Sequence, residues 1–189
     1  MPTLYVVAGP NGCGKSTLTR TTWFRGVEVM DPDALTRDLM AGYPAWAARE
    51  AFRHRQAALS AGRTLAVETT LAGSGVLRFM EVARQVGYRV VLHYVSVNSA
   101  DQALLRIRNR VALGGHDVPE VDVRRWFARS HANLPAAIER ADEVMLYDNT
   151  DSGLPHREVA MLTGGAWWSA ERLPVWAAAA IARVTAPNR

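Results

Sequence analysis

The sequence predicts an α/β fold in which a mostly parallel sheet of five or six strands lies between two layers of helices, as a three-layer sandwich. Two observations predict it. Short runs of β-branched and aromatic residues alternate with longer helical stretches through most of the chain, and no Pro/Gly/Ser-rich linker divides the 189 residues. Hydrophobic residues make up 49% and charged residues 21%, which is ordinary for a globular protein. We therefore expect a single domain over residues 1–189.

The strands are predicted from apolar runs that end at turn residues. The expected strands are residues 4–8, 27–30, 64–67, 89–97 and 143–147. The first, LYVVA, stops at GPNG, and the fourth, RVVLHYVSV, is the strongest strand pattern in the chain.

The helices are predicted from the stretches between these runs and from their stop signals. The expected helices are residues 15–24, 45–61, 76–86, 99–113, 121–141 and 167–184. Gly62, Gly87 and the pair Gly114-Gly115 end the helices at 45–61, 76–86 and 99–113, and Ser99 is the N-cap of the last of these. Residues from about 151 to 189 form a C-terminal embellishment whose pattern is weaker, in which Trp167, Trp168 and Trp176 are expected in the core.

Charge and hydropathy exclude several classes of protein. The formal charge is +4, too small to indicate a nucleic-acid partner but suited to an anionic substrate. No run reaches the roughly 18 apolar residues of a membrane span, and the first residues show no signal peptide. Cys13 is the only cysteine, which favours a reducing compartment. We expect a cytoplasmic protein without a membrane partner.

The strongest motif is GPNGCGKST at residues 9–17, which follows a strand and opens a helix. It matches G-x-x-x-x-G-K-[ST], the phosphate loop of P-loop NTPases, so the fold is expected to be P-loop NTPase-like. The loop amides bind phosphate, Lys15 reaches the β- and γ-phosphates of ATP, and the Ser16 hydroxyl coordinates Mg²⁺. Lys15 is the only lysine in the chain, which makes a chance glycine-rich turn improbable. The expected nucleotide-binding residues here are Gly9, Pro10, Asn11, Gly12, Cys13, Gly14, Lys15, Ser16 and Thr17.

Cys13 allows two interpretations. Lys15 and the helix start could lower the pKa of its thiol and make it reactive. The interpretation we favour is that a small residue fits this variable position of the loop.

Acidic residues follow two of the predicted strands. Asp31-Pro32-Asp33 comes after the second strand and Glu68-Thr69-Thr70 after the third, so both are expected at the ligand edge of a parallel sheet. A kinase needs a carboxylate to accept the proton of the acceptor hydroxyl; Asp33 is our choice and Asp31 the competing one. Glu68 can bind a metal-bound water or a substrate hydroxyl, and Thr70 can hydrogen-bond the substrate. Helix capping is the alternative role at both places.

Residues 104–130 form a basic segment that Gly114-Gly115 interrupts. Arg106 and Arg110 share one helix face, as do Arg125 and Arg129 on the next helix. We interpret the segment as a lid that clamps the γ-phosphate and excludes water; two solvated helices are the alternative. The chain has neither the Asp-Glu strand ending of a mechanical ATPase nor the N-K-x-D motif of a GTPase.

The combination of GPNGCGKST, DPD, ETTLAG, RVALGGHDVP with RRWFARS, and LYDN resembles the zeta-toxin family of P-loop kinases, in particular its short stand-alone branch. The match is collinear from about residue 3 to 150. The resemblance implies a kinase that uses ATP and Mg²⁺. It also implies a hydroxyl acceptor such as UDP-N-acetylglucosamine and a small antitoxin as partner.

The resemblance also implies roles for single residues. Lys15 and Ser16 hold phosphate and metal, Asp33 is the catalytic base, and Arg110 is a lid arginine that stabilises the transferred phosphate. Glu68 and Thr70 contact the substrate.

The short branch departs from the larger toxins at the second lid position, which falls near His116 in the sequence GGH. Arg124 or Arg125 is then expected to supply the missing charge. Arg49 matches a basic position of the short branch and is expected to meet a phosphate of the substrate.

The sequence therefore predicts an ATP-dependent small-molecule kinase whose acceptor bears phosphate. Two other functions stay open at this point: a nucleotide-binding regulatory module that transfers nothing, and a housekeeping kinase of another metabolite.

Overall fold

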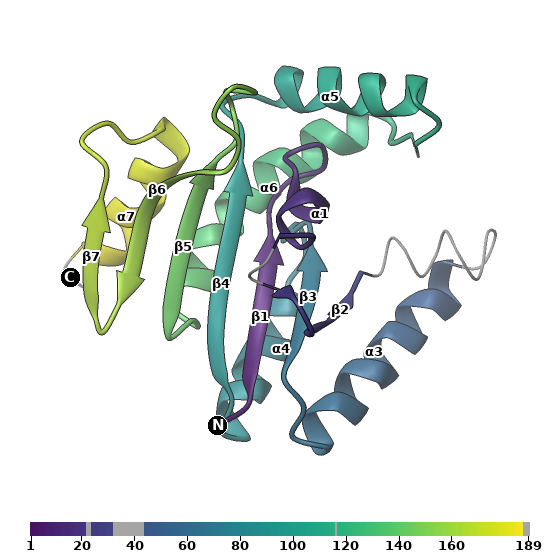
Figure 1. Ribbon diagram of the computed structural model, residues 1–189, viewed down its shortest axis with the longest axis vertical. Helices are drawn as coiled ribbons and strands as arrows, with labels where there is room; N and C mark the ends of the chain where they lie inside the picture. The colour runs from purple at the N-terminus through teal and green to yellow at the C-terminus, as the bar shows by residue number, and fades with distance from the viewer. Residues whose placement is uncertain (22–23, 32–43, 116, 187–189) are drawn as a thin grey trace.

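The computed structural model describes residues 1–21, 24–31, 44–115 and 117–186. Its centre is a seven-stranded sheet in the order β2-β3-β1-β4-β5-β6-β7 (Figure 1). The strands are β1 Thr3–Ala8, β2 Glu28–Met30, β3 Leu65–Thr69, β4 Arg89–Ser96, β5 Glu143–Asp148, β6 Arg157–Thr163 and β7 Ala166–Ser169. The first five are parallel, and β6 and β7 are antiparallel to their neighbours.

Helices connect these strands and cover both faces of the sheet, as Figure 1 shows. They are α1 Lys15–Leu18, α3 Pro44–Ser60, α4 Gly75–Gln85, α5 Ala100–Ala112, α6 Glu120–Ile138 and α7 Val175–Thr185. The prediction of a three-layer α/β sandwich with a mostly parallel sheet is confirmed.

The alternation of side chains along the central strand divides the interior into two cores. In β1, Leu4 and Val6 face a core that α4, the second half of α6 and α7 complete. Val7 faces a second core on the other side of the sheet, where Leu18 of α1 and Ile107 of α5 pack. All of these side chains are buried. Both faces of β1 are therefore apolar, which is why it reads as an uninterrupted apolar run.

Register places the ends of the central strands at the same edge. Ala8 at the end of β1 pairs with Thr69 of β3 on one side and with Tyr94 of β4 on the other. The loops after these strands therefore converge, and the phosphate loop lies among them.

The sheet has seven strands rather than five or six because the C-terminal part adds an antiparallel pair. Residues 167–184 were expected to form one helix, but Trp167 and Trp168 lie in β7, and α7 begins only at Val175. The turn at Thr163–Ala166, with both of its glycines at positive φ, reverses the chain between β6 and β7. Trp176 is buried as expected, whereas Trp168 is 49% exposed.

The helix after the phosphate loop is also shorter than the expected span of 15–24, because α1 ends at Leu18. Two of the next three residues are threonines, Thr19 and Thr21, and both of their hydroxyls form hydrogen bonds. The Thr21 hydroxyl donates to the carbonyl of Leu18 at 2.7 Å, and the Thr19 hydroxyl donates to Glu68 at 2.6 Å. Such local bonds compete with the continuation of a helix. Within the described ranges, the structure contains no helix long and apolar enough to cross a membrane.

Candidate active site

The phosphate loop connects β1 to α1 and has the backbone that its glycines were expected to permit. Gly12 has φ +76°, a conformation that side chains with a Cβ rarely adopt. A Cβ on Gly9 would lie 2.0 Å from the carbonyl oxygen of Val95 in β4, so the loop passes directly over the sheet. Lys15 folds back over the loop, and its ammonium donates to the carbonyl of Pro10 at 3.1 Å.

A cavity of about 680 Å³ lies in front of this loop at the carboxyl ends of β1 and β3. The loop lines one side of it, a set of acidic and hydroxyl groups another, and two arginines of α5 a third. Its lining residues are Asn11, Gly12, Gly14, Lys15, Ser16, Thr17, Thr19, Arg20, Asp31, Glu68, Thr69, Thr70, Arg106, Ile107, Arg110 and Asn149. Of the predicted loop residues, Gly9, Pro10 and Cys13 are buried and frame the loop from behind.

Glu68 is the buried acid of this cavity, with 4% of its surface exposed at the end of β3. One carboxylate oxygen accepts the Ser16 hydroxyl at 3.0 Å, and the other accepts the Thr19 hydroxyl at 2.6 Å. Glu68 was expected to contact substrate, with a metal-bound water as its other use. The structure directs both of its oxygens to α1 and the turn after it, beside the hydroxyl expected to coordinate Mg²⁺.

The residues at this corner fit a magnesium ion. Mg²⁺ prefers oxygen ligands and usually keeps waters and phosphate oxygens around one or two protein groups. The Ser16 hydroxyl, the Glu68 carboxylate and the nearby Asp31 all line the cavity and supply such oxygens. Among the described residues, no three His, Cys, Asp or Glu side chains form a metal cage, so phosphate oxygens of the nucleotide would have to complete the shell.

Two arginines of α5 enter the cavity from the opposite side. Arg106 and Arg110 both line it, as their spacing of four residues predicted for one helix face. Arg106 also donates to the carbonyl of Thr150 at 3.4 Å, which ties the helix to the loop after β5. Arg106 was noted as part of the basic segment but was not chosen as a site residue.

The cations expected from α6 lie elsewhere. Arg124 forms ion pairs with Asp101 at 2.6 Å and Glu120 at 2.8 Å, and Arg125 pairs with Asp122 at 2.7 Å. Neither arginine lines the cavity. Acids of α5 and of the first turn of α6 hold both arginines at the surface here, and their contact with a nucleotide stays a prediction.

Three further predicted residues have different outcomes. Thr70 lines the cavity, and its hydroxyl accepts the backbone N–H of Ala72 at 3.4 Å. Arg49 is exposed on α3 and does not line this cavity, so its contact with substrate phosphate stays a prediction. Asp33 and His116 lie outside the described residues. Asp31, the alternative acid, lies in the cavity wall.

Cys13 is a fully buried residue of the phosphate loop. Burial raises the pKa of its thiol to about 11, and the nearby Lys15 ammonium lowers it by less than burial raises it. This favours the interpretation that Cys13 fits the loop by its size.

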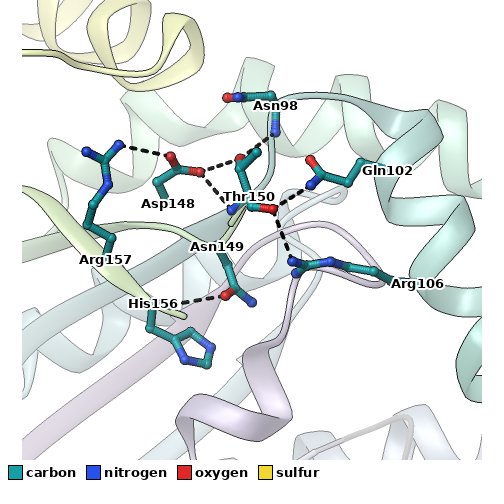
Figure 2. A network of polar contacts seen from close by, with 8 residues as sticks. All are labelled: Asn98, Gln102, Arg106, Asp148, Asn149, Thr150, His156 and Arg157. Carbon is teal, nitrogen blue, oxygen red and sulfur yellow. Dashed lines mark hydrogen bonds and ion pairs between the residues drawn. The ribbon is translucent and has the colours of Figure 1, made fainter. Parts of the chain in front are cut away.

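Several site residues were missed from the sequence. Arg20 lines the cavity just after α1. Asn149, the last letter of LYDN, lines it too, and its side-chain amide donates to the carbonyl of Cys13 at 2.8 Å. His156 contacts the loop from behind, with Nε2 3.0 Å from the carbonyl oxygen of Gly14. Figure 2 shows Asn149 and His156 within a larger polar network. For Asn149 the position two residues after the predicted strand 143–147 was a usable signal, whereas nothing in the sequence pairs His156 with residue 14.

Comparison with known proteins agrees with this geometry. A family model described as an AAA domain matches residues 4–132, more than half of the chain. A protein of Haemophilus influenzae that is described as uncharacterized is 31% identical over 116 residues, which are 59% of this chain and 83% of that protein.

Solved structures resemble the fold. The AvrRxo1-ORF1:ORF2 complex with ATP contains a chain that superposes with a TM-score of 0.73 at 17% identity, over 100% of this chain and 65% of that one. The present chain therefore spans less than two thirds of the length of that AvrRxo1-ORF1:ORF2 chain. The PezAT toxin-antitoxin system of Streptococcus pneumoniae gives a TM-score of 0.64 at 16% identity, over 97% of this chain and 78% of the other. Similarity at these sequence identities shows a shared fold and no more. The family is shown by the family model, which matches residues 4–132 and so includes the phosphate loop: the chain belongs to the AAA domain family of P-loop proteins.

Proposed function

We propose that this protein is an ATP-dependent phosphotransferase that phosphorylates a hydroxyl group of a small molecule. The observation that carries the proposal is the single cavity in which the phosphate loop, the Ser16–Glu68 pair and the arginines Arg106 and Arg110 meet. Phosphoryl transfer needs these parts: a loop for the phosphates, a metal-side acid, and cations for the charge on the transferred group.

ATP and Mg²⁺ are the proposed cofactors. The loop residues 9–17 take the phosphates, Lys15 leaves its internal bond with Pro10 to reach them, and Ser16 and Glu68 hold the metal or a water bound to it. Mg²⁺ when bound would neutralise charge on the β- and γ-phosphates. The resemblance of fold to a chain crystallised with ATP supports this nucleotide.

The catalytic base of the proposed reaction is an acid that follows β2 in the sequence. Asp33 is the proposed group that orients the acceptor hydroxyl and takes its proton, and Asp31 is the alternative that the cavity wall supports. Asp31 directly follows β2 at the ligand edge of the sheet, and Asp33 comes two residues later in the sequence. Arg110 is the proposed clamp on the transferred phosphate, and Arg106 joins it because it lines the same wall.

We propose a nucleotide sugar such as UDP-N-acetylglucosamine as the acceptor, and a small antitoxin as a protein partner. The sequence resemblance to zeta toxins supports both, and so does the fold shared with the PezAT toxin-antitoxin system. Among the described residues that line the cavity, four cationic side chains, Lys15, Arg20, Arg106 and Arg110, exceed two acids, Asp31 and Glu68, which suits an acceptor that carries phosphate.

The test is a transfer assay with a matched set of variants. The protein is incubated with Mg-ATP and a panel of nucleotide sugars and other phosphate-bearing alcohols, and products are identified by mass spectrometry. Lys15→Ala is expected to abolish nucleotide binding and transfer. Asp33→Ala is expected to abolish transfer while ATP binding stays largely intact, and Asp31→Asn shows which acid is the base.

The outcomes separate the candidate functions. A phosphorylated nucleotide sugar supports the proposal, and a product from another alcohol in the panel indicates a housekeeping kinase. ATP binding without any product indicates a regulatory module. Full transfer activity in Asp33→Ala removes the assignment of that residue as base.

A further inference from the structure

The segment from Asp148 to Arg157, between the end of β5 and the start of β6, lies against the phosphate loop although it falls outside the family-matched residues 4–132. Figure 2 shows its polar contacts. Those to helix α5, which carries the cavity arginines, are drawn in Figure 2, and two further contacts reach the phosphate loop itself.

Two consecutive carbonyls of the phosphate loop are held by side chains of this segment. The Asn149 amide donates to the carbonyl of Cys13 at 2.8 Å, and His156 Nε2 lies 3.0 Å from the carbonyl oxygen of Gly14. Because a carbonyl only accepts hydrogen bonds, Nε2 of His156 must carry the hydrogen. The two side chains are linked in turn, since the backbone N–H of His156 donates to Asn149 Oδ1 at 3.1 Å.

These bonds orient the amides that bind phosphate. In a trans peptide unit the carbonyl and the following N–H point in opposite directions. A Cys13 carbonyl held by Asn149 therefore turns the N–H of Gly14 away from the Asn149 amide and fixes its direction. The carbonyl of Gly14 also accepts the first backbone bonds of α1, from Thr17 and Leu18, both at 3.1 Å. His156 adds a side-chain donor to it and so secures the peptide unit that carries the N–H of Lys15.

The fit around Gly14 leaves no space between the loop and its support. A Cβ on Gly14 would lie 2.4 Å from Asn149 Nδ2 and 3.2 Å from His156 Nε2. His156 itself has φ +52°, a left-handed conformation that residues other than glycine rarely adopt. That conformation lets one residue face the loop with its side chain while its N–H reaches Asn149.

The same segment holds helix α5. Arg157 pairs with Asp148 at 3.1 Å, and Asp148 accepts both the N–H and the hydroxyl of Thr150. The carbonyl of Thr150 then accepts Gln102 at 2.6 Å and Arg106 at 3.4 Å. One short segment therefore fixes the phosphate loop on one side and the helix of the cavity arginines on the other.

We propose that His156 and Arg157, the two residues that lead into β6, are positioning residues for nucleotide binding. They act through the loop carbonyl of Gly14 and through Asp148, and they give the C-terminal β6–β7–α7 part a function in the site. The inference rests on the proposed nucleotide-binding function, and its test therefore includes a readout that needs no nucleotide.

The variants are His156→Ala, His156→Gln and Arg157→Ala, with Arg89→Ala as the matched control. Arg89 pairs with Glu143 at the other end of β4 and β5, and its side chain is 43% exposed against 42% for Arg157. The two arginine variants therefore remove ion pairs of similar exposure, only one of which is near the loop. Arg157→Ala carries the test by itself if His156→Ala does not fold.

The first readout is hydrogen exchange of the loop amides, residues 9–18, in the nucleotide-free protein. His156→Ala is expected to speed this exchange by about five- to tenfold, on the scale of one lost hydrogen bond, and Arg157→Ala, which reaches the loop only through Asp148 and the residue after it, is expected to speed it by a smaller factor. Arg89→Ala is expected to leave it unchanged, and His156→Gln, which keeps a side-chain N–H donor, is expected to restore it to within about twofold. Loop exchange equal to that of wild type or of Arg89→Ala overturns the inference, whether it is found in His156→Ala or, where that variant does not fold, in Arg157→Ala.

The second readout is the dissociation constant of ATP, measured with a fluorescent ATP analogue. His156→Ala is expected to weaken binding by about five- to tenfold, with rescue by His156→Gln and no change in Arg89→Ala. Wild-type protein that binds no ATP refutes the proposed function, and the exchange measurement then still decides whether His156 and Arg157 position the loop. Normal ATP binding in His156→Ala, beside a wild type that does bind, refutes this inference alone.

Discussion

Mild acid is expected to destabilise this fold through a buried histidine in the central strand β4. His93 is 1% exposed and lies between the rings of Tyr5, Phe24 and Tyr147, with Nδ1 3.1 Å from the Tyr147 hydroxyl. Burial lowers the pKa of its imidazole from 6.5 to about 4, and the charge of Glu143 opposes this only in part.

The sign and size of the effect follow from the two pKa values. The unfolded chain takes up a proton at His93 as the pH falls through about 6.5, whereas the folded protein does so only near pH 4, so the stability is fully present above pH 6.5 and falls below it. Between about pH 7.5 and pH 5 this difference lowers the free energy of unfolding by about 2 kcal/mol. The full effect of His93, reached below pH 4, is about 3 kcal/mol. His131, whose pKa burial also lowers to about 4, adds a loss of similar size. Together they make a large fraction of the 5–15 kcal/mol that stabilises a typical domain.

The assay is urea unfolding across this pH range for wild type and His93→Asn. The variant loses ring packing at every pH, so its cost is constant, and its decline between about pH 7.5 and pH 5 should be about 2 kcal/mol smaller than that of wild type. His54→Gln, at an exposed position of α3, is the matched control and should follow wild type. Parallel pH curves for wild type and His93→Asn would refute the reasoning, because all other titrating groups are common to both proteins.

Three other predictions concern the site. Gly12→Ala should fold but bind ATP at least about tenfold more weakly, as measured by calorimetry. The new Cβ would lie 2.5 Å from the Ala103 carbonyl oxygen of α5, and φ +76° is a strained backbone conformation for alanine. Binding at the wild-type level would contradict this. Glu68→Gln should keep its thermal midpoint within a few degrees while ATP binding loses most of its dependence on Mg²⁺, and an unchanged Mg²⁺ titration would remove Glu68 from the metal side. Cys13 should react with iodoacetamide far more slowly than free cysteine near pH 7.5, with or without ATP, because burial raises the pKa of its thiol to about 11; rapid labelling of the folded protein would show that the thiol is accessible.

The parts that the sequence predicted well are those set by local pattern. The run Leu4–Ala8 is apolar on both faces and gave β1, and GPNGCGKST gave the loop that follows, because its glycines meet a backbone requirement that few other residues meet. The cavity positions of Glu68, Thr70 and Arg110 followed from strand ends and helix spacing.

The parts that the sequence did not predict depend on contacts between distant residues. The pairs of Arg124 with Glu120 and of Arg125 with Asp122 are local on α6, but only the fold brings Asp101 of α5 to Arg124. His156 reaches Gly14 across 142 positions of the chain, and no local periodicity reports such a pair. Trp167 and Trp168 fit a helix or a strand equally well in a short apolar run, and the pairing of Met161 with Trp168 decides for the strand.

The order of strands has a consequence for anyone who would trim the chain. A fragment cut after residue 132, where the recognisable family segment stops, would lose β5 and leave the whole length of β4 as an unpaired border. An open border of that kind invites pairing with other molecules, and the fragment would also lack the last residues of α6 that fill the larger core. The stretch by which this protein is recognised is therefore shorter than the stretch that must be made together for it to fold.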